Sequence, residues 1–307
     1  MYSKSPFDPR AWLYSKFPEE LYPCRADLIE EYNERILAGL KVMGQSEVSI
    51  CGLVRNLAHI LPLNIYRIEH IASLFAFAKI YVYENDSTDG TVDILKDWAK
   101  RNPQVKFQSE TIGYAPLIQN RSQYRTERMA AARNKLLALA REDRTHYVLL
   151  IDADIKGGVS PEGLAHSFSF CDELKWDMMG SNGIIMQPSE DKTSFRPLFY
   201  DSWAYREWDL GPHEDCEINL KQFFRGEYPI KLHSNFGGCG LYRWESLMDL
   251  EYNNIYADGP LKGQSDCEHC IVAYKMRQLG RDKIYLNPSQ ICLYDYYRFE
   301  NIAGNSG

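Results

Sequence analysis

The stretch "HYVLLIDADI", residues 146–155, carries the clearest fold signal in the sequence. Four apolar residues, 148–151, lead directly into two acidic residues, Asp152 and Asp154, which a single alanine separates. A short, unbroken apolar run bounded by polar residues is typical of a strand buried on both faces. Side chains two residues apart on a strand share a face, so these two carboxylates can approach one cation. The stretch therefore predicts a buried strand with paired carboxylates at its end.

Similar strands alternate with helices around this stretch. We expect strands within residues 47–56, 79–91, 105–110, 147–155 and 176–184, and helices at 65–78, 92–101 and 126–142. This alternation predicts an α/β fold with a mostly parallel sheet covered by helices on both faces. Ligands bind beyond the carboxyl ends of the strands in such sheets. The polar residues at those ends are Arg55, Asn56, Asp86, Asp89, Asp152 and Asp154.

The chain has three regions but no break between domains. Residues 1–45 look like an irregular arm followed by a helix at 26–40, with Leu28, Tyr32, Ile36 and Leu40 on one face. Residues 46–184 hold the regular alternation. Residues 185–307 begin with a loop-like aromatic segment, continue with a strand, a glycine-rich turn and a helix start at 230–247, and end with a helix at 267–280 and a strand at 283–294. Without an internal repeat or a low-complexity linker, we expect one continuous domain.

Composition limits the classes of function. The chain has 307 residues, 45% of them hydrophobic and 25% charged, as in soluble globular proteins. A net charge of −7 argues against a general nucleic-acid-binding protein, which needs clustered Lys and Arg. The N-terminus has no signal-peptide core, and no apolar stretch is long enough for a transmembrane segment. The eight cysteines are scattered, so we expect reduced thiols and a cytoplasmic protein.

The Asp152-Ala153-Asp154 pattern predicts a divalent metal site. Mn²⁺ and Mg²⁺ favour carboxylate oxygen and leave coordination positions open for substrate phosphates. A solvated strand end is the simple alternative, because such a pair of aspartates is common. The apolar run directly before the pair favours the metal.

The stretch "YENDSTDGT", residues 83–91, ends the strand before it and starts a helix. Asp89 can cap this helix, and it can also accept hydrogen bonds from a nucleobase or a ribose hydroxyl. Capping alone does not call for Glu84, Asn85 and Asp86 ahead of it. We therefore expect this turn to contact a nucleotide as well.

Several of these motifs together resemble a known class of enzymes. "RN" at 55–56, "YENDSTDGT", "MAAARNKLL" at 129–137 and "VLLIDADI" occur in the order seen in GT-A glycosyltransferases. "FYDSWAYREWD" at 199–209 and the "SDCEHC … LNPSQICLY" tail are similar to one branch, the fungal capsule-associated α-1,3-mannosyltransferases. The resemblance covers roughly residues 47–295. It implies a Rossmann-like GT-A domain with a nucleotide-sugar-binding half at 46–184 and an acceptor-binding half at 185–307.

The resemblance also implies ligands and residue roles. The donor would be a GDP- or UDP-sugar, the acceptor a glycan hydroxyl, the cofactor Mn²⁺ or Mg²⁺, and the sugar could be mannose. Asp152 and Asp154 would hold the metal, with His269 as a third ligand and His213 and His233 in reserve. Donor-binding candidates are Arg55, Asn56, Glu84, Asp86, Asp89, Arg133, Asn134, Asp152 and Gly238. Acceptor-binding candidates are Trp203, Arg206 and Asp209, and catalytic candidates are Asp201, Asp266 and Glu268.

Other interpretations stay open at this point. The mannosyltransferase resemblance favours retention of the anomeric configuration, whereas an inverting enzyme would use Asp266 or Glu268 as a general base. A nucleotidyltransferase needs the same sheet and a metal, but it would usually show a glycine-rich basic loop where this chain has "CGLVRNLAHI" at 51–60. A nucleotide-sugar-binding module without activity is the third possibility, and a test for slow donor hydrolysis would distinguish it.

Overall fold

The computed structural model describes residues 16–115, 122–188, 195–208 and 217–296. Within them a ten-stranded sheet has the order β3-β2-β1-β4-β9-β6-β10-β5. Its strands are β3 (Val105–Glu110), β2 (Phe77–Asn85), β1 (Glu47–Val54), β4 (Tyr147–Asp152), β9 (Cys239–Arg243), β6 (Met178–Pro188), β10 (Ile284–Tyr296) and β5 (Gly158–Val159). Two short strands lie beside this path: β7 (Phe195–Phe199) pairs with β6, and β8 (Ile230–Lys231) pairs with β10.

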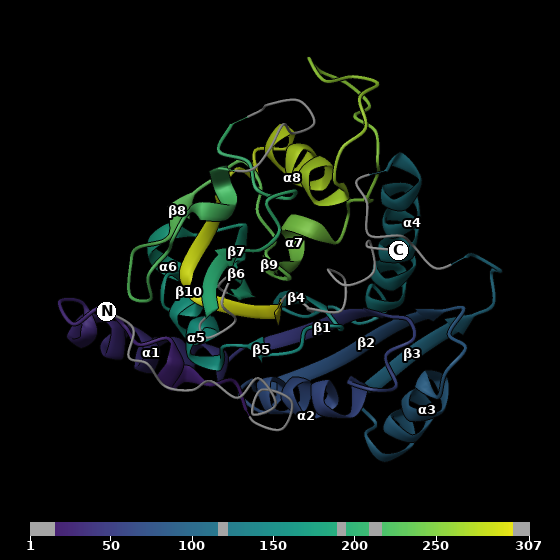
Figure 1. Ribbon diagram of the computed structural model, residues 1–307, viewed down its shortest axis with the longest axis horizontal. Coiled ribbons are helices and arrows are strands. Elements are labelled where there is room, and N and C mark those ends of the chain that lie inside the picture. Colours follow the sequence, from purple (N-terminus) through teal and green to yellow (C-terminus); the bar gives the residue numbers. More distant parts are fainter. Residues whose placement is uncertain (1–15, 116–121, 189–194, 209–216, 297–307) are drawn as a thin grey trace, which may run out of the picture.

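The longer strands of the sheet share one direction. β3, β2, β1 and β4 pair in parallel, and so do β6 and β10. β9 is antiparallel to both β4 and β6, so these two blocks point the same way. The predicted mixed α/β domain with a mostly parallel sheet is confirmed, and in Figure 1 the sheet curls toward β10.

Helices cover both faces of the sheet. Figure 1 shows α2 (Leu61–Ala72) and α3 (Thr91–Arg101) on one side and α4 (Gln123–Ala140) on the other. Beyond them lie α1 (Ile29–Met43), α5 (Pro161–Ser169), α6 (Cys171–Leu174), α7 (Trp244–Leu247) and α8 (Glu268–Gln278), with 3₁₀ turns at Glu19–Leu21 and Glu217–Leu220. Among the described helices none has the length and apolar character needed to cross a membrane.

The β4 strand shows why its sequence is apolar without interruption. Leu149 and Ile151 pack into the core that includes α2 and α5, whereas Val148 and Leu150 pack into a second core that includes α4 and α8. Burial of both faces follows from helices on both sides of a central strand. This strand is therefore a rigid support for the residues that follow it.

Two helix predictions in the first half need correction. The helix expected at 65–78 begins at Leu61 and ends at Ala72, and Phe77 already belongs to β2. Pro62 in the first turn was the missed start signal, because a proline suits that position. The face predicted for the N-terminal helix is right at Tyr32 and Ile36 but wrong at its end, where Leu40 is 37% exposed while Gly39 is buried. A Cβ at Gly39 would lie 1.7 Å from the Ala165 carbonyl oxygen, so this glycine allows α1 to pack closely on α5.

The second half differs more from expectation. The aromatic segment expected to be a loop contains β7, and the longer strand at 230–247, β9, follows the glycine-rich turn instead of preceding it. Helix α5 was not predicted, although Ser160 accepts a hydrogen bond from the Gly163 N–H and Pro161 opens the helix. The cysteines that the structure describes are free thiols, as expected.

Candidate active site

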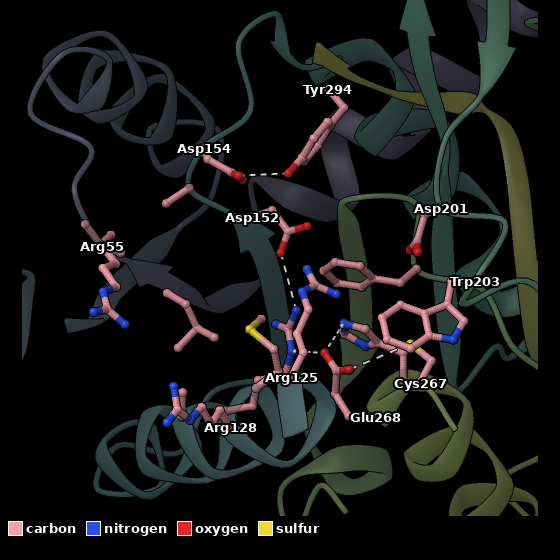
Figure 2. Close-up of a pocket in the computed structure, with 18 of the residues that line it drawn as sticks. Arg55, Arg125, Arg128, Asp152, Asp154, Asp201, Trp203, Cys267, Glu268 and Tyr294 are labelled. Atoms are coloured by element: carbon pink, nitrogen blue, oxygen red, sulfur yellow. Dashed lines mark hydrogen bonds and ion pairs between the residues drawn. The ribbon is translucent and has the colours of Figure 1, made fainter. Parts of the chain in front are cut away.

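A pocket of about 560 Å³ opens at the carboxyl ends of β1, β2 and β4. Its wall is completed by one face of α4, the segment at 199–203 and the first residues of α8, and Figure 2 shows many of the side chains that point into it. The charged residues that line it are Arg55, Arg125, Arg128, Arg133, Lys135, Asp152, Asp154, Asp201 and Glu268.

Asp152 ends β4 beside the pocket. Its backbone N–H donates to the Gly238 carbonyl at 2.9 Å, and its Oδ1 accepts a hydrogen bond from Arg133 at 3.3 Å. Burial raises the pKa of Asp152 to about 7; Arg133 opposes this rise, and the neighbouring Asp154 and Asp201 carboxylates add to it. The site thus crowds carboxylates at one wall of the pocket, and a divalent cation would relieve their repulsion.

Asp154 lies in the turn after β4 and also lines the pocket. Its Oδ2 accepts a hydrogen bond from the Tyr294 hydroxyl at 2.8 Å (Figure 2). The buried Asn64 side chain donates to the carbonyls of Ala153 and Ile155, at 2.8 and 2.9 Å. The structure therefore brings the two predicted metal ligands, Asp152 and Asp154, to one cavity and fixes the backbone around the second.

Arg133 joins β4 to α8. It is 4% exposed, and besides Asp152 it donates through Nε to Glu268 Oε1 at 3.1 Å. Glu268 is the first residue of α8 and is itself 4% exposed. A guanidinium between two carboxylates satisfies both of them, so Arg133 holds Asp152 and Glu268 in place at the same wall.

His269 lies beside Glu268 on the pocket wall. Its ring stacks on Phe236 with the centroids 3.8 Å apart. Burial, with a smaller effect from Arg133, holds its pKa well below the usual value, so the ring is neutral. Neither ring nitrogen has a hydrogen-bond partner among the described residues. A neutral, buried imidazole with unsatisfied nitrogens is suited to be a metal ligand.

Asp201 lines the pocket from the segment after β7. Its backbone has a left-handed conformation, φ 70°, and its Oδ2 accepts a hydrogen bond from the Gly237 N–H at 3.0 Å. Burial raises the pKa of Asp201 to about 7 in spite of this hydrogen bond. Trp203 also lines the pocket, and the Arg125 guanidinium lies 5.5 Å from the centre of its ring.

The turn after β2 lies outside the lining of the pocket. The Asp86 carboxylate accepts hydrogen bonds from the N–H groups of residues 112, 113 and 114. Asp89 accepts hydrogen bonds from the N–H groups of Ala58 and of Thr91, the first residue of α3. Asn56 and Glu84 also accept backbone N–H groups of this turn, from residues 88 and 87. These four residues brace the loops around the donor side, and their contact with a nucleotide stays a prediction.

Five further candidates that the structure describes also lie outside the lining: Asn134, Arg206, His233, Gly238 and Asp266. Asp266 is buried and accepts hydrogen bonds from Arg206 and Tyr256, so it anchors the segment at 203–206. Asn134 exchanges two hydrogen bonds with the backbone of residue 252. The Gly238 carbonyl supports β4. Asp209 and His213 lie outside the described residues, and the ring of His233 lies 3.3 Å from Arg277.

Sequence reasoning missed several residues of the pocket. Arg125 and Arg128 on α4, together with Tyr200 and Tyr294, all line it. Arg125 and Arg128 precede Arg133 on the same helix, and this basic helix face was a signal that the sequence did offer. Tyr294 had no such signal, because only the pairing of β10 with β6 brings it to the pocket.

A divalent metal fits part of this donor set. Among the described residues, no three His, Cys, Asp or Glu side chains lie close enough together to hold an ion. Asp152 and Asp154 nevertheless face one cavity, and the His269 ring nitrogens are unsatisfied in its wall. Two carboxylates with positions left for phosphate oxygen and water are typical of Mg²⁺ and Mn²⁺ sites.

Comparison with known proteins adds a family match. Residues 68–156 match the model described as Glycosyl transferase family 2. This segment runs from within α2 through β4 and ends just past Asp154. No curated protein matches the chain.

Three solved structures resemble the chain at low sequence identity. The mannosyltransferase PcManGT from Pyrobaculum calidifontis, in complex with GDP-Man and Mn²⁺, is 13% identical with a TM-score of 0.47, covering 93% of this chain and 61% of its own. TarS 1–349 from S. aureus, in complex with UDP-GlcNAc, is 14% identical with a TM-score of 0.47, covering 85% and 62%. GalNAc-T7 with UDP, GalNAc and Mn²⁺ is 13% identical with a TM-score of 0.48, covering 91% and 54%.

The chain thus spans about three fifths of the length of the first two structures, 61% and 62%. The matched family segment contains the strand end with Asp152 and Asp154 and most of the parallel half of the sheet. Residues 68–156 thus match a glycosyltransferase family, and the domain that contains them has the mixed α/β fold described above.

Proposed function

We propose that this chain transfers a sugar from a nucleotide-diphospho-sugar, with GDP or UDP as the nucleotide, to a hydroxyl of a glycan, with the help of Mn²⁺ or Mg²⁺. One observation carries the proposal: Asp152 and Asp154 face an open pocket at the end of a buried strand within the segment that matches glycosyltransferase family 2. The pocket has the size of a small-molecule site and combines carboxylates with several guanidinium groups.

The acidic side of the pocket would hold the metal. Asp154 and Asp152 are the first two ligands, and His269 is the candidate for a third. When bound, a divalent ion neutralises charge on the leaving nucleoside diphosphate. Arg133 keeps Asp152 and Glu268 oriented, so this wall is already ordered without a ligand.

The basic side of the pocket would bind the donor. Arg55 and Arg128 both donate to the Ala115 carbonyl, at 3.4 and 3.2 Å, and both line the cavity. Arg128 also lies over the Tyr114 ring, 3.9 Å from its centre. Guanidinium groups held in this way can form charge-assisted hydrogen bonds to phosphate oxygens.

The opposite wall would bind the acceptor. Trp203 offers a half-buried ring to the pocket, and a sugar can pack its apolar face against such a ring. Arg206 and Asp266 hold the segment that carries this ring. Trp203 is therefore our main candidate for acceptor contact.

The stereochemical course is the finer part of the proposal. The resemblance to the capsule mannosyltransferases implies mannose and retention. Two pocket carboxylates support inversion as the alternative: Glu268 is buried at the wall, and the pKa of Asp201, raised to about 7 by burial, suits a general base near neutral pH. The position of Glu268 in the lining favours it over Asp266 as the base of an inverting reaction.

A screen of GDP- and UDP-sugars tests the function. Each donor is incubated with the protein, with Mn²⁺, with Mg²⁺ or with EDTA, and release of the nucleotide is measured with and without glycan acceptors. We expect metal-dependent release from one donor class, and NMR of the product gives the anomeric configuration. Tight donor binding without any turnover would contradict the proposed transferase activity and indicate a nucleotide-sugar-binding module without activity.

A further inference from the structure

A tyrosine of the last strand holds the carboxylate of Asp154. The Tyr294 hydroxyl donates to Asp154 Oδ2 at 2.8 Å, and Figure 2 shows the two side chains meeting at the upper side of the pocket. The main chain makes a second connection, because Lys156 N donates to the Tyr294 carbonyl at 2.8 Å. Tyr294 thus ties the turn after β4 to β10 through both its backbone and its side chain.

The Tyr294 ring is itself fixed. It stacks on Tyr200 with the ring centroids 3.8 Å apart and the planes at 10°. Gly238 lies beside both rings in a left-handed conformation, φ 82°, and a Cβ there would lie 2.8 Å from Cys292 Sγ. That Cβ would also stand 3.7 Å from the Tyr294 ring and 3.8 Å from the Tyr200 ring. The hydroxyl therefore reaches Asp154 from a ring with little freedom to turn.

Asn64 fixes the same turn from the other side of the sheet. This α2 residue is 4% exposed, and its amide donates to the carbonyl groups directly before and after Asp154. Asn64 determines where the backbone of Asp154 lies, and Tyr294 determines where its carboxylate points. Two elements far apart in the sequence, α2 and β10, thus meet at this one residue.

The Tyr294 hydroxyl and the Arg133 guanidinium differ in charge. Arg133 brings a positive charge to Asp152, whereas the Tyr294 hydroxyl orients Asp154 without cancelling its charge. A carboxylate that is held by a neutral donor keeps its attraction for a cation, and such outer partners strengthen metal binding by fixing the ligand.

We propose that Tyr294 is a positioning residue that orients the Asp154 carboxylate for the divalent cation, with the Tyr200 ring as its support. This inference rests on the proposed function, because it assumes that Asp154 is a metal ligand. It assigns to β10, which lies outside the segment matching the glycosyltransferase family, a role in the metal site.

The test is the Tyr294→Phe variant. Phenylalanine keeps the stacked ring and the backbone connection and removes only the hydroxyl. We expect the dissociation constant for Mn²⁺, measured by electron paramagnetic resonance on the full chain without donor, to rise about tenfold to a hundredfold. In turnover assays the Mn²⁺ concentration for half-maximal rate should rise in parallel, while kcat at saturating Mn²⁺ recovers.

Tyr285→Phe is the matched control, because Tyr285 is a partly buried tyrosine at the start of the same strand and is not part of the pocket lining. Its Mn²⁺ affinity should equal that of the wild type. A Tyr294→Phe protein with unchanged Mn²⁺ affinity would overturn the inference alone, whatever its melting temperature. A wild-type protein that binds no Mn²⁺ would overturn the inference together with the metal dependence of the proposed function.

Discussion

Two acidic turns follow parallel strands of the same sheet, and they use their carboxylates in opposite ways. After β2, Asp86 accepts hydrogen bonds from backbone N–H groups of the 112–114 segment and lies outside the pocket lining. After β4, Asp152 and Asp154 face the pocket, and their hydrogen-bond partners come from α4 and β10. The Asp86 carboxylate stabilises the fold of a neighbouring loop, whereas the carboxylates of Asp152 and Asp154 face a pocket with room for a cation.

The pKa values separate the two turns. Although burial opposes it, hydrogen bonds from Gly113, Asn85 and other donors lower the pKa of Asp86 to about 2. Burial and neighbouring carboxylates raise the pKa of Asp152 to about 7 against the effect of Arg133. A carboxylate that accepts several hydrogen bonds from nearby N–H groups is stabilised as an anion. A carboxylate crowded among other carboxylates is stabilised as an anion only by a cation. An acidic residue at a strand end can therefore be assigned to ligand binding only after the hydrogen-bond partners of its carboxylate are known.

The largest effect is expected from Asp154→Asn. This change keeps the size of the side chain and its contact with Tyr294 but removes the charge that would hold the metal. We expect kcat/KM for the nucleotide-sugar to fall about a hundredfold to a thousandfold, a loss typical of removing electrostatic stabilisation at a leaving group. Metal-dependent release of the nucleotide measures it.

The Asp93→Asn variant is the control for this substitution, since Asp93 is an exposed residue of α3, with 82% of its side chain accessible. A folded Asp154→Asn protein with the turnover of this control would mean that the turn after β4 holds no metal. The contrast between the two acidic turns would then lose its functional meaning.

Arg133→Met should give the largest loss of stability. The change leaves the half-buried Asp152 and the buried Glu268 without their cation, which costs about 3–5 kcal/mol in the free energy of unfolding. Urea denaturation at neutral pH measures it. Mn²⁺ should restore part of the loss, because it replaces the missing positive charge. Equal stability of variant and wild type in EDTA would show that the pocket does not depend on this cation.

More of the fold could be predicted from the sequence for residues 46–184 than for residues 185–307. The apolar run of β4 and the strand at 105–110 could be located because each signal is local, and β3 has the predicted bounds. Asp152 and Asp154 do reach one cavity, but the strand rule behind that expectation fails, because β4 ends at Asp152 and Asp154 lies in the following turn. Tyr294 and Asn64 could not be predicted, because each reaches the turn after β4 from a distant part of the chain.

The predicted site residues show the same limit, because their partners in the folded chain could not be predicted. Asp86, Asp89 and Asp266 have residue types suited to binding or catalysis, yet their described partners are structural. Sequence patterns indicate which polar residues stand at strand ends and helix starts. They do not indicate which backbone N–H groups or arginines lie next to them in the folded chain.

Asp201 allows the pKa contrast to be tested in the folded protein. Its pKa is raised to about 7 by burial, so the folded chain retains a proton that the unfolded chain has already lost above about pH 4. Without metal, the stability of the wild type relative to Asp201→Asn should therefore fall as pH rises from about 4 to about 7. Urea denaturation of both proteins across this range measures the difference. A constant difference would show that Asp201 is an ordinary, ionised carboxylate.

Asp86→Asn is expected to have the smallest effect, with a pH dependence of the opposite sign. Asp86 and Asp201 share a left-handed backbone conformation, with φ values of 57° and 70°, and asparagine tolerates it, so the two substitutions are matched. We expect Asp86→Asn to cost roughly 1 kcal/mol of stability, since its hydrogen bonds are partly exposed. Because the folded pKa is lowered, this contribution is present above about pH 4 and disappears as pH falls through about 2.

Turnover of the Asp86→Asn variant decides what the turn after β2 does. If its charge serves only the loop at 112–114, kcat/KM per folded molecule should stay within about twofold of the wild type, because a hydrogen bond to that loop does not reach the reacting atoms. A large rise in KM for the nucleotide-sugar, with kcat unchanged, would instead mean that Asp86 contacts the bound nucleotide, since that pattern follows from losing an interaction equal in ground and transition states. The two acidic turns would then differ in which part of the donor they bind, and not in whether they bind it.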